Sequence, residues 1–420
     1  MIDREPFDRY DRALSTNAEL VAAAVTELAG ELDSLSWDEV ASALESRYRA
    51  LVTEYGTYAA AVAVEFYTQQ REASQPTTSY EAVQFYPKDW ALLADDVRSE
   101  AVRGREVAAV LRSLAGRSQQ RVMAYADETI DRNATLDPAH PKWAIVPHVG
   151  ACGFCLMLGA NGFVYGSEAK ADASRHPSCK CTPAVDFDSS NPFLDGYRPA
   201  ELQNVYAASR RIVEDDARAE WDAMSAEERS RYSRNGRASY DAYLRGRIAG
   251  TMGKWHGVDA RAISGKQFRK LKDEKPLEWA GYTRMAELGL MPRLLYEDRG
   301  ANANFDCTLG REDMDGYWDL KTISGGMGAI KKRMAECHSK WARLTAPGVK
   351  AQSGVDLAHL GDAQAVVDNR WGKSSDEAAM SQVASSMRYL SGRGGIKFSR
   401  AIFIKSDGTA VLIENGSSRP

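Results

Sequence analysis

Hydrophobic positions in the first 130 residues repeat at the spacing of an α-helix. One such face consists of Leu20, Val21, Ala24, Val25 and Leu28. A second helix is expected to begin at Trp37 behind the capping residue Ser36, and a further helix covers residues 48–70. Residues 74–78 interrupt the pattern before a charged amphipathic helix from about residue 89 to residue 132. The N-terminal region is therefore predicted to be mainly helical.

Short apolar runs and turn signals replace this repeat in the middle of the chain. Residues 143–147 form one apolar run, and Asn161-Gly162 is a strong signal for a hairpin turn before a short strand at residues 163–165. A very polar stretch follows from residue 201 to about residue 247, which we interpret as exposed helix and linker. The middle of the chain is therefore expected to hold a small α+β module and then a polar connection.

After Pro276 the pattern predicts alternating helices and strands. A helix is expected from Pro276 to Leu288, with Gly289 as its stop. The elements expected after it are three strands at 293–297, 304–309 and 317–323, two helices at 329–344 and 376–390, and two strands at 398–405 and 409–414. This order predicts an α/β domain with a mixed sheet.

Length and pattern together predict a multidomain protein, because 420 residues exceed the usual size of one domain. The expected parts are a helical region at 1–140, a cysteine module at 141–195, a polar helical linker at 196–270 and an α/β domain at 271–420. No apolar run approaches the roughly 20 residues of a membrane span, so no membrane partner is expected.

Charge is distributed unevenly along the chain. From Lys254 onward there are 26 Lys and Arg against 20 Asp and Glu, whereas the residues before Lys254 carry 28 against 38. The two halves are therefore expected to meet different partners. A mildly basic C-terminal half suits a nucleic acid, although solvated faces often carry such an excess.

Four of the six cysteines gather with one histidine in the central module. They form Cys152-x-x-Cys155 and, about twenty residues on, His176-x-x-Cys179-x-Cys181. Two such pairs can close a tetrahedral Zn²⁺ shell, and the equal gaps favour Cys152, Cys155, His176 and Cys179, with Cys181 as the substitute. Disulfides or reduced buried thiols are the alternatives. The polar, acidic start of the chain does not resemble a signal peptide, which favours reduced thiols and a metal.

A second group of polar residues lies in the predicted α/β domain. Asp306 falls on one predicted strand, and Asp319 and Lys321 fall on the next, where positions i and i+2 share a face. Asp306 and Asp319 would hold Mg²⁺ or another hard divalent ion, and Glu278 on the preceding helix would add a third carboxylate. Lys321 would orient a water or offset charge on phosphorus.

Each of these residues also has a structural interpretation that the sequence leaves open. Asp319 and Lys321 could be exposed residues of an edge strand, and Glu278 could be a first-turn carboxylate that the helix dipole favours. Lys331-Lys332-Arg333 could follow a phosphate backbone or form a solvated helix face. Gln382 could be an auxiliary polar group of the site. The residues expected to be structural are Cys307, Cys337, His256, His338 and His359.

The cysteine module, from Cys152-Gly-Phe-Cys155 through Asn161-Gly162 to His176-Pro-Ser-Cys179-Lys-Cys181, resembles the MuF-like minor head proteins of tailed phages. The resemblance covers about residues 1–190. It implies a virion component associated with portal and capsid proteins, and some members of that family extend into variable C-terminal toxin domains.

The C-terminal set of Glu278, Asp306 and Asp319-Leu-Lys321 resembles the PD-(D/E)xK nuclease superfamily. The same residues, with the helix around Gln382, look like the nuclease domains of contact-dependent inhibition toxins, several of which cleave tRNA. Phe305 stands where the superfamily pattern has proline. This second resemblance covers about residue 275 to the end and implies a metal-dependent nuclease.

Both resemblances together predict a phage minor head protein that carries a toxin nuclease, acts on RNA such as tRNA in the bacterial cytoplasm, and is countered by an immunity protein. A purely structural virion protein, whose C-terminal domain binds nucleic acid or capsid without cleaving, is the main rival. A repair or packaging nuclease that cuts DNA is a further alternative.

Overall fold

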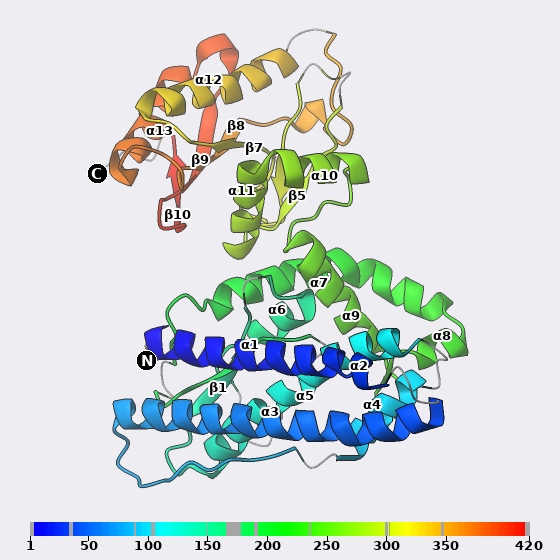
Figure 1. Ribbon diagram of the computed structural model, residues 1–420. Helices are drawn as coiled ribbons and strands as arrows, with labels where there is room; N and C mark the ends of the chain where they lie inside the picture. The colour runs from blue at the N-terminus through cyan, green and yellow to red at the C-terminus, as the bar shows by residue number, and fades with distance from the viewer. Residues whose placement is uncertain are drawn as a thin grey trace. The chain divides into compact units, whose positions relative to one another are not determined.

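The computed structural model of the protein (Figure 1) describes residues 4–32, 37–87, 90–101, 106–148, 150–164, 178–188, 192–234, 237–298, 301, 303–345 and 348–415. It consists of two compact units, Met1–Ala200 and Glu201–Pro420. The finer four-part division predicted from the sequence stays a prediction. Among the described residues, no helix combines the length and the apolar character that crossing a membrane requires.

The first unit is mainly helical, as predicted. Its helices are α1 (Arg4–Glu27), α2 (Ala29–Leu32), α3 (Trp37–Ser74), α4 (Trp90–Ala101), α5 (Val107–Leu136) and α6 (Gly153–Gly159). The long helices α1, α3 and α5 pack against one another. Val21 and Val25 in α1 and Leu28 just after it are buried, whereas Leu20 is 53% exposed, so the apolar face of the helix is narrower than the sequence pattern indicated. Ser36 lies outside the described residues.

Two predictions for this unit were wrong in detail. The helix expected over residues 89–132 is two helices, α4 and α5. Phe163 and Val164 form no strand, and Tyr165 lies outside the described residues. Gly162 does adopt the left-handed backbone of a turn at φ 66°, but the Phe163 ring then packs edge-on against Tyr197 instead of pairing with a strand.

The strand pair that forms instead is β1 (Lys142–Val146) with β2 (Thr182–Asp186). The two strands are antiparallel, and Val146 is opposite Thr182. The β1–β2 pair therefore brings the residues just after β1 close to the residues just before β2, which include Cys179 and Cys181.

The second unit contains one six-stranded sheet and several helices. Its helices are α7 (Pro199–Ala223, which crosses the boundary), α8 (Ala226–Ser230), α9 (Tyr240–Trp255), α10 (Gly265–Glu274), α11 (Pro276–Glu287), α12 (Met327–Leu344) and α13 (Asp376–Leu390), with 3₁₀ turns at Leu357–His359 and Arg393–Gly395. The strands of the main sheet are β5 (Pro292–Leu294), β6 (Cys307–Leu309), β7 (Tyr317–Thr322), β8 (Ala363–Asp368), β9 (Phe398–Ile404) and β10 (Ala410–Glu414). The short strands β3 (Ser233–Arg234) and β4 (Arg237–Ala238) form a separate pair.

The sheet is mixed, as predicted, with the order β10-β9-β8-β7-β6-β5. Strands β5, β6 and β7 form an antiparallel meander, β7, β8 and β9 run parallel, and β10 returns antiparallel to β9. Helices α12 and α13 supply the two crossovers that parallel strands need. They cover one face of the sheet, and α11 covers the other, which gives three layers (Figure 1).

The sequence pattern missed strand β8, because it predicted no strand between the helices expected at 329–344 and 376–390. All six of its residues are buried, so it shows no alternation of polar and apolar positions. It pairs in parallel with β7, where Asp319 is opposite Ala365. This pairing makes β7, which carries Asp319 and Lys321, an inner strand of the sheet and not an edge strand.

A buried arginine joins α7 and α11 to the β9–β10 turn inside the second unit. The Arg284 guanidinium donates to both carboxylate oxygens of Glu201, at 2.7 and 3.0 Å, and to Glu287 at 2.8 Å. It also donates to the carbonyl oxygen of Gly408 at 2.7 Å. Helix α7 therefore belongs to the structure that supports the sheet.

Candidate active site and cysteine cluster

Strand β7 presents Asp319 and Lys321 from one face, as the spacing predicts. The Lys321 Nζ lies 2.6 Å from the Asp319 Oδ2. The Asp319 side chain is fully buried, and the Lys321 side chain is 11% exposed. The alternative that Asp319 and Lys321 are exposed residues of an edge strand is therefore wrong.

Asp306 lies directly before β6 and not on a strand, which corrects the sequence prediction. Its backbone N–H donates to the Trp318 carbonyl at 3.2 Å, and its Oδ2 accepts a 2.7 Å hydrogen bond from the Leu320 N–H. Both contacts fix the carboxylate against β7. Asp306 is therefore held beside Asp319 even though the strand begins one residue later.

Lys340 on α12 completes this group, and sequence reasoning missed it. Its Nζ lies 3.3 Å from the Asp306 Oδ1 and also contacts the Asp319 Oδ1. The side chain is 18% exposed. In the sequence, Lys340 lies between Cys337 and Trp341, which are both on the buried face of α12. This position could have indicated that the Lys340 side chain points toward the interior.

The two carboxyl groups have different proton affinities. Burial and the charge of the neighbouring Asp306 together raise the pKa of Asp319 to about 6, against the opposing effect of Lys340 and Lys321. Burial also opposes ionisation of Asp306, but Lys340 and Lys321 hold its pKa below the usual range. Asp306 is thus the ionised member of the pair over a wide pH range, while Asp319 titrates closer to neutrality.

Glu278 lies in the first turn of α11, and its Oε2 is 3.0 Å from the Lys275 Nζ. Burial and the charge of Asp306 raise its pKa. Glu278 lines the same pocket of about 350 Å³ as Asp306 and Lys340. Further residues that line this pocket are Gln267, Lys270, Lys275, Tyr282, Glu297, Asn304 and Arg343.

The other residues singled out in the sequence lie elsewhere. Gln382 on α13 donates to Ser386 at 3.0 Å and does not line this pocket. His256 contacts Glu287 at 3.0 Å, and His359 contacts Asp356 at 2.7 Å. His338, Cys307 and Cys337 are buried, and Lys331, Lys332 and Arg333 are exposed on α12.

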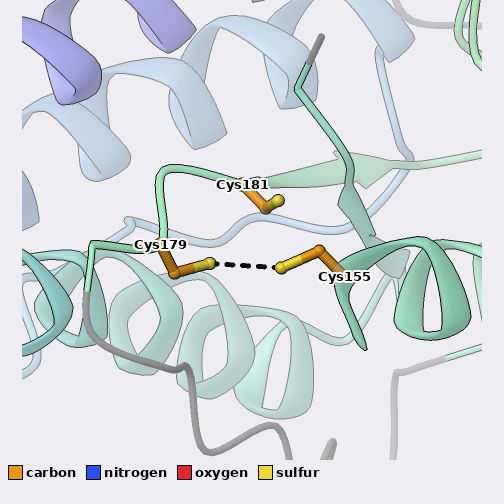
Figure 2. A group of neighbouring side chains, drawn as sticks. All are labelled: Cys155, Cys179 and Cys181. Carbon is orange, nitrogen blue, oxygen red and sulfur yellow. Dashed lines mark hydrogen bonds between the residues drawn. The ribbon is translucent and has the colours of Figure 1, made fainter. Parts of the chain in front are cut away.

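Three cysteines of the central module converge in the first unit (Figure 2). The sulfur atoms of Cys155, Cys179 and Cys181 all lie within 4.8 Å of one another, and all three residues are buried. The Cys155 and Cys179 sulfurs are 3.4 Å apart. Cys155 comes from the first turn of α6, and the other two come from the segment that leads into β2. This cluster could hold a metal ion such as zinc.

The remaining predicted zinc ligands are placed differently. Cys152 is exposed at the N-cap of α6, three residues before Cys155. His176 lies outside the described residues. Among the described residues, the cysteine cluster is the group of side chains that could supply three or more ligands to one ion. The carboxylates of Glu278, Asp306 and Asp319 do not lie close enough together to form a second one.

A comparison with family models supports a phage virion protein in the first half of the chain, while the narrower MuF-like assignment stays a prediction. Residues 1–209 match the family described as VG15 protein, a phage virion-associated family. No curated protein matches the chain. One solved structure, the CdiA-CT/CdiI toxin and immunity complex from Burkholderia pseudomallei, is 16% identical over 36% of this chain and 89% of that chain, with a TM-score of 0.22. A TM-score this low supports no inference about the fold.

Proposed function

We propose that the protein is a phage virion component whose C-terminal unit is a metal-dependent endonuclease that cleaves RNA such as tRNA. The buried group of Asp306, Asp319, Lys321 and Lys340 beside the pocket carries this proposal. The match of residues 1–209 to a phage virion-associated family supports the virion part. The PD-(D/E)xK assignment and the MuF-like assignment belong to the same proposal.

The burial of this group favours a functional role. Removing two carboxylates and two ammonium groups from water costs free energy that an apolar core would not incur, and mutual attraction only partly offsets it. Carboxyl groups with separated pKa values, at the wall of a pocket, are typical of sites that handle protons or bind cations. The arrangement of these four residues therefore favours a catalytic role over a purely structural one.

The residues fit a hard divalent ion in their donor chemistry. Asp306 and Asp319 both contact the single Lys340 nitrogen, so a cation already bridges them. Their oxygen atoms are the ligands that Mg²⁺ selects. Glu278 lines the same pocket as Asp306 but does not converge with the two aspartates on one point in this structure, so it would have to move to act as a third ligand. A bound Mg²⁺ would polarise the phosphate and lower the pKa of an attacking water.

Lys321 and Lys340 would stabilise charge in the proposed reaction. Lys321 and Lys340 place positive charge beside the carboxylates, where it can stabilise the negative charge that develops on phosphorus during attack. A raised pKa keeps Lys340 protonated, because Asp306 and Asp319 outweigh the effect of burial. Lys340 would therefore act as a fixed cation and not as a base.

The walls of the pocket suit a phosphate backbone. Lys270 from α10 and Arg343 from α12 line it and are exposed. Cations at these positions can contact phosphates on either side of the bond to be cut, since phosphate contacts position a nucleic acid without reading its sequence. The choice of RNA, and of tRNA, comes from the resemblance to contact-dependent inhibition toxins.

The proposed partners follow from the two resemblances. Portal and capsid proteins would hold the first unit in the virion, an immunity protein would neutralise the nuclease, and the bacterial cytoplasm would be its place of action. These partners and this location are proposals that accompany the function.

Expression of the full chain in bacteria tests the proposal. The wild type should arrest growth and cut cellular tRNA, whereas Asp319→Asn and Lys340→Met should abolish both effects. Asp362→Asn and Lys397→Met, which alter an exposed pair 3.4 Å apart in the same unit, serve as matched controls and should stay toxic. A harmless wild type, or full toxicity of Asp319→Asn, would favour the structural virion protein.

A further inference from the structure

We infer that Cys152, Cys155, Cys179 and Cys181 form a closed zinc site with four thiolate ligands, which joins the start of α6 to the segment before β2. This inference does not depend on the proposed nuclease, because the cluster lies in the first unit. It also replaces His176 with Cys181 among the ligands that the spacing favours.

The three buried sulfurs lie close to the separation that zinc requires. A tetrahedral ion with Zn–S bonds of about 2.3 Å holds its sulfurs roughly 3.8 Å apart. The Cys155 and Cys179 sulfurs are 3.4 Å apart, and Cys181 lies within 4.8 Å of both. Figure 2 shows the three side chains pointing toward one another from the start of α6 and from the segment before β2. A disulfide would use only two of these three thiols.

Cys152 is placed to supply the fourth ligand. It is the N-cap of α6 and Cys155 is the third residue of that helix, the two positions that lie close enough in a capping box for each side chain to reach the other's backbone N–H. Its side chain does not cap the helix, and a change of its χ1 rotamer would turn the exposed sulfur toward the cluster. The Cys-x-x-Cys knuckle then contributes two ligands from one turn.

A turn at Ser178 and the β1–β2 strand pair place the second pair of ligands, Cys179 and Cys181. Ser178, next to Cys179, has a φ of 64°, a left-handed conformation that is uncommon for a residue other than glycine. Val146 pairs with Thr182, so the end of β1 lies beside the chain that follows Cys181. The two ligand pairs are thus brought together by a turn and a strand pair.

Zinc at this position would join the start of α6 to the segment before β2, and that segment is already held against α1. The segment that carries Cys179 and Cys181 also contacts α1, because Lys180 pairs with Glu19 at 2.6 Å and Thr182 donates to Asp11. A shell of four protein ligands leaves no open position for a substrate, so the role is structural. The metal-binding free energy would then contribute to the stability of this unit.

Metal analysis of the full chain tests this inference, with Cys307→Ser in the second unit as the control. The wild type and Cys307→Ser should each hold about one zinc per chain, and Cys152→Ser and Cys181→Ser should lose the zinc on dialysis. His176→Ala should keep it. Replacement of zinc by Co²⁺ in the wild type should give the absorption spectrum of a site with four thiolates, a measurement that requires no variant to fold.

Three results would overturn the inference. The wild type could purify without zinc and fail to take up Co²⁺. Its Co²⁺ spectrum could show three thiolates and one nitrogen, with zinc lost in His176→Ala and kept in Cys152→Ser. A Cys155–Cys179 disulfide in the native chain, found by mass spectrometry, would exclude the metal altogether.

Discussion

Replacing Arg284 with Met should destabilise the second unit strongly, because two carboxylates would lose their shared cation. The Arg284 side chain is 8% exposed, and the side chains of Glu201 and Glu287 are 24% and 27% exposed. Removing one partner of a buried ion pair costs about 3–5 kcal/mol. The partial exposure of the two glutamates lets water reach them, so we expect a loss of about 3 kcal/mol in the free energy of unfolding.

Glu201→Gln should cost less than Arg284→Met. The amide oxygen can still accept from the guanidinium, and Glu287 at 2.8 Å still neutralises it. We expect a loss of about 1 kcal/mol for this variant, the size of one ordinary hydrogen bond. The two variants therefore separate the loss of a charge from the loss of the whole network.

Urea unfolding of the full chain, followed by hydrogen exchange of peptides from β9, would measure both changes in the second unit. Arg210→Met is the matched control, because Arg210 lies on the same helix α7 as Glu201 and forms an exposed pair with Glu214 at 2.9 Å. It should leave the unfolding of this unit unchanged. A loss of less than ~0.5 kcal/mol for Arg284→Met, the range of ordinary surface changes, would refute the assignment of a buried, stabilising network.

Further predictions concern the same unit. A fragment that begins at residue 271 lacks Glu201, so it should unfold at a lower urea concentration than a fragment that begins at residue 201. Circular dichroism would measure the two unfolding midpoints, and equal midpoints would contradict this prediction. Glu287→Ala should lower the melting temperature, because Glu287 contacts both Arg284 and His256. An unchanged melting temperature in a thermal scan would contradict this prediction. The raised pKa of Asp319 means that its ionisation opposes folding, so the wild type should lose stability relative to Asp319→Asn as the pH rises from about 4 to above 6. A stability difference that stays constant with pH would show that Asp319 does not titrate there.

The helices and the Asp-x-Lys strand could be predicted because their patterns are local. The i and i+2 positions of Asp319 and Lys321 share a face in any strand, and α13 has the predicted bounds, with Ser375 as its cap and Leu390 as its last residue. The strand β8 could not be predicted in this way. Its residues are buried on both faces, so they lack the alternation that marks a strand beside solvent.

The candidate site could be predicted only in part, because half of it depends on long-range packing. Lys340 is 34 residues from Asp306 and 21 from Asp319 in sequence, and the crossover helix α12 brings it to both. A lysine on an amphipathic helix is usually read as a solvated residue. Lys340 and Lys321 also offset the repulsion between the two carboxylates, an effect that the positions of Asp306 and Asp319 in the sequence do not indicate.

Incubation of the purified full chain with RNA and Mg²⁺ tests the central proposal most directly. The wild type should cleave tRNA in a reaction that EDTA stops, Asp319→Asn and Lys340→Met should fold but leave the RNA intact, and Lys397→Met should cleave at the wild-type rate. RNA that stays intact with the wild type, or cleavage that persists in both Asp319→Asn and Lys340→Met, would contradict the assignment of this site as a nuclease.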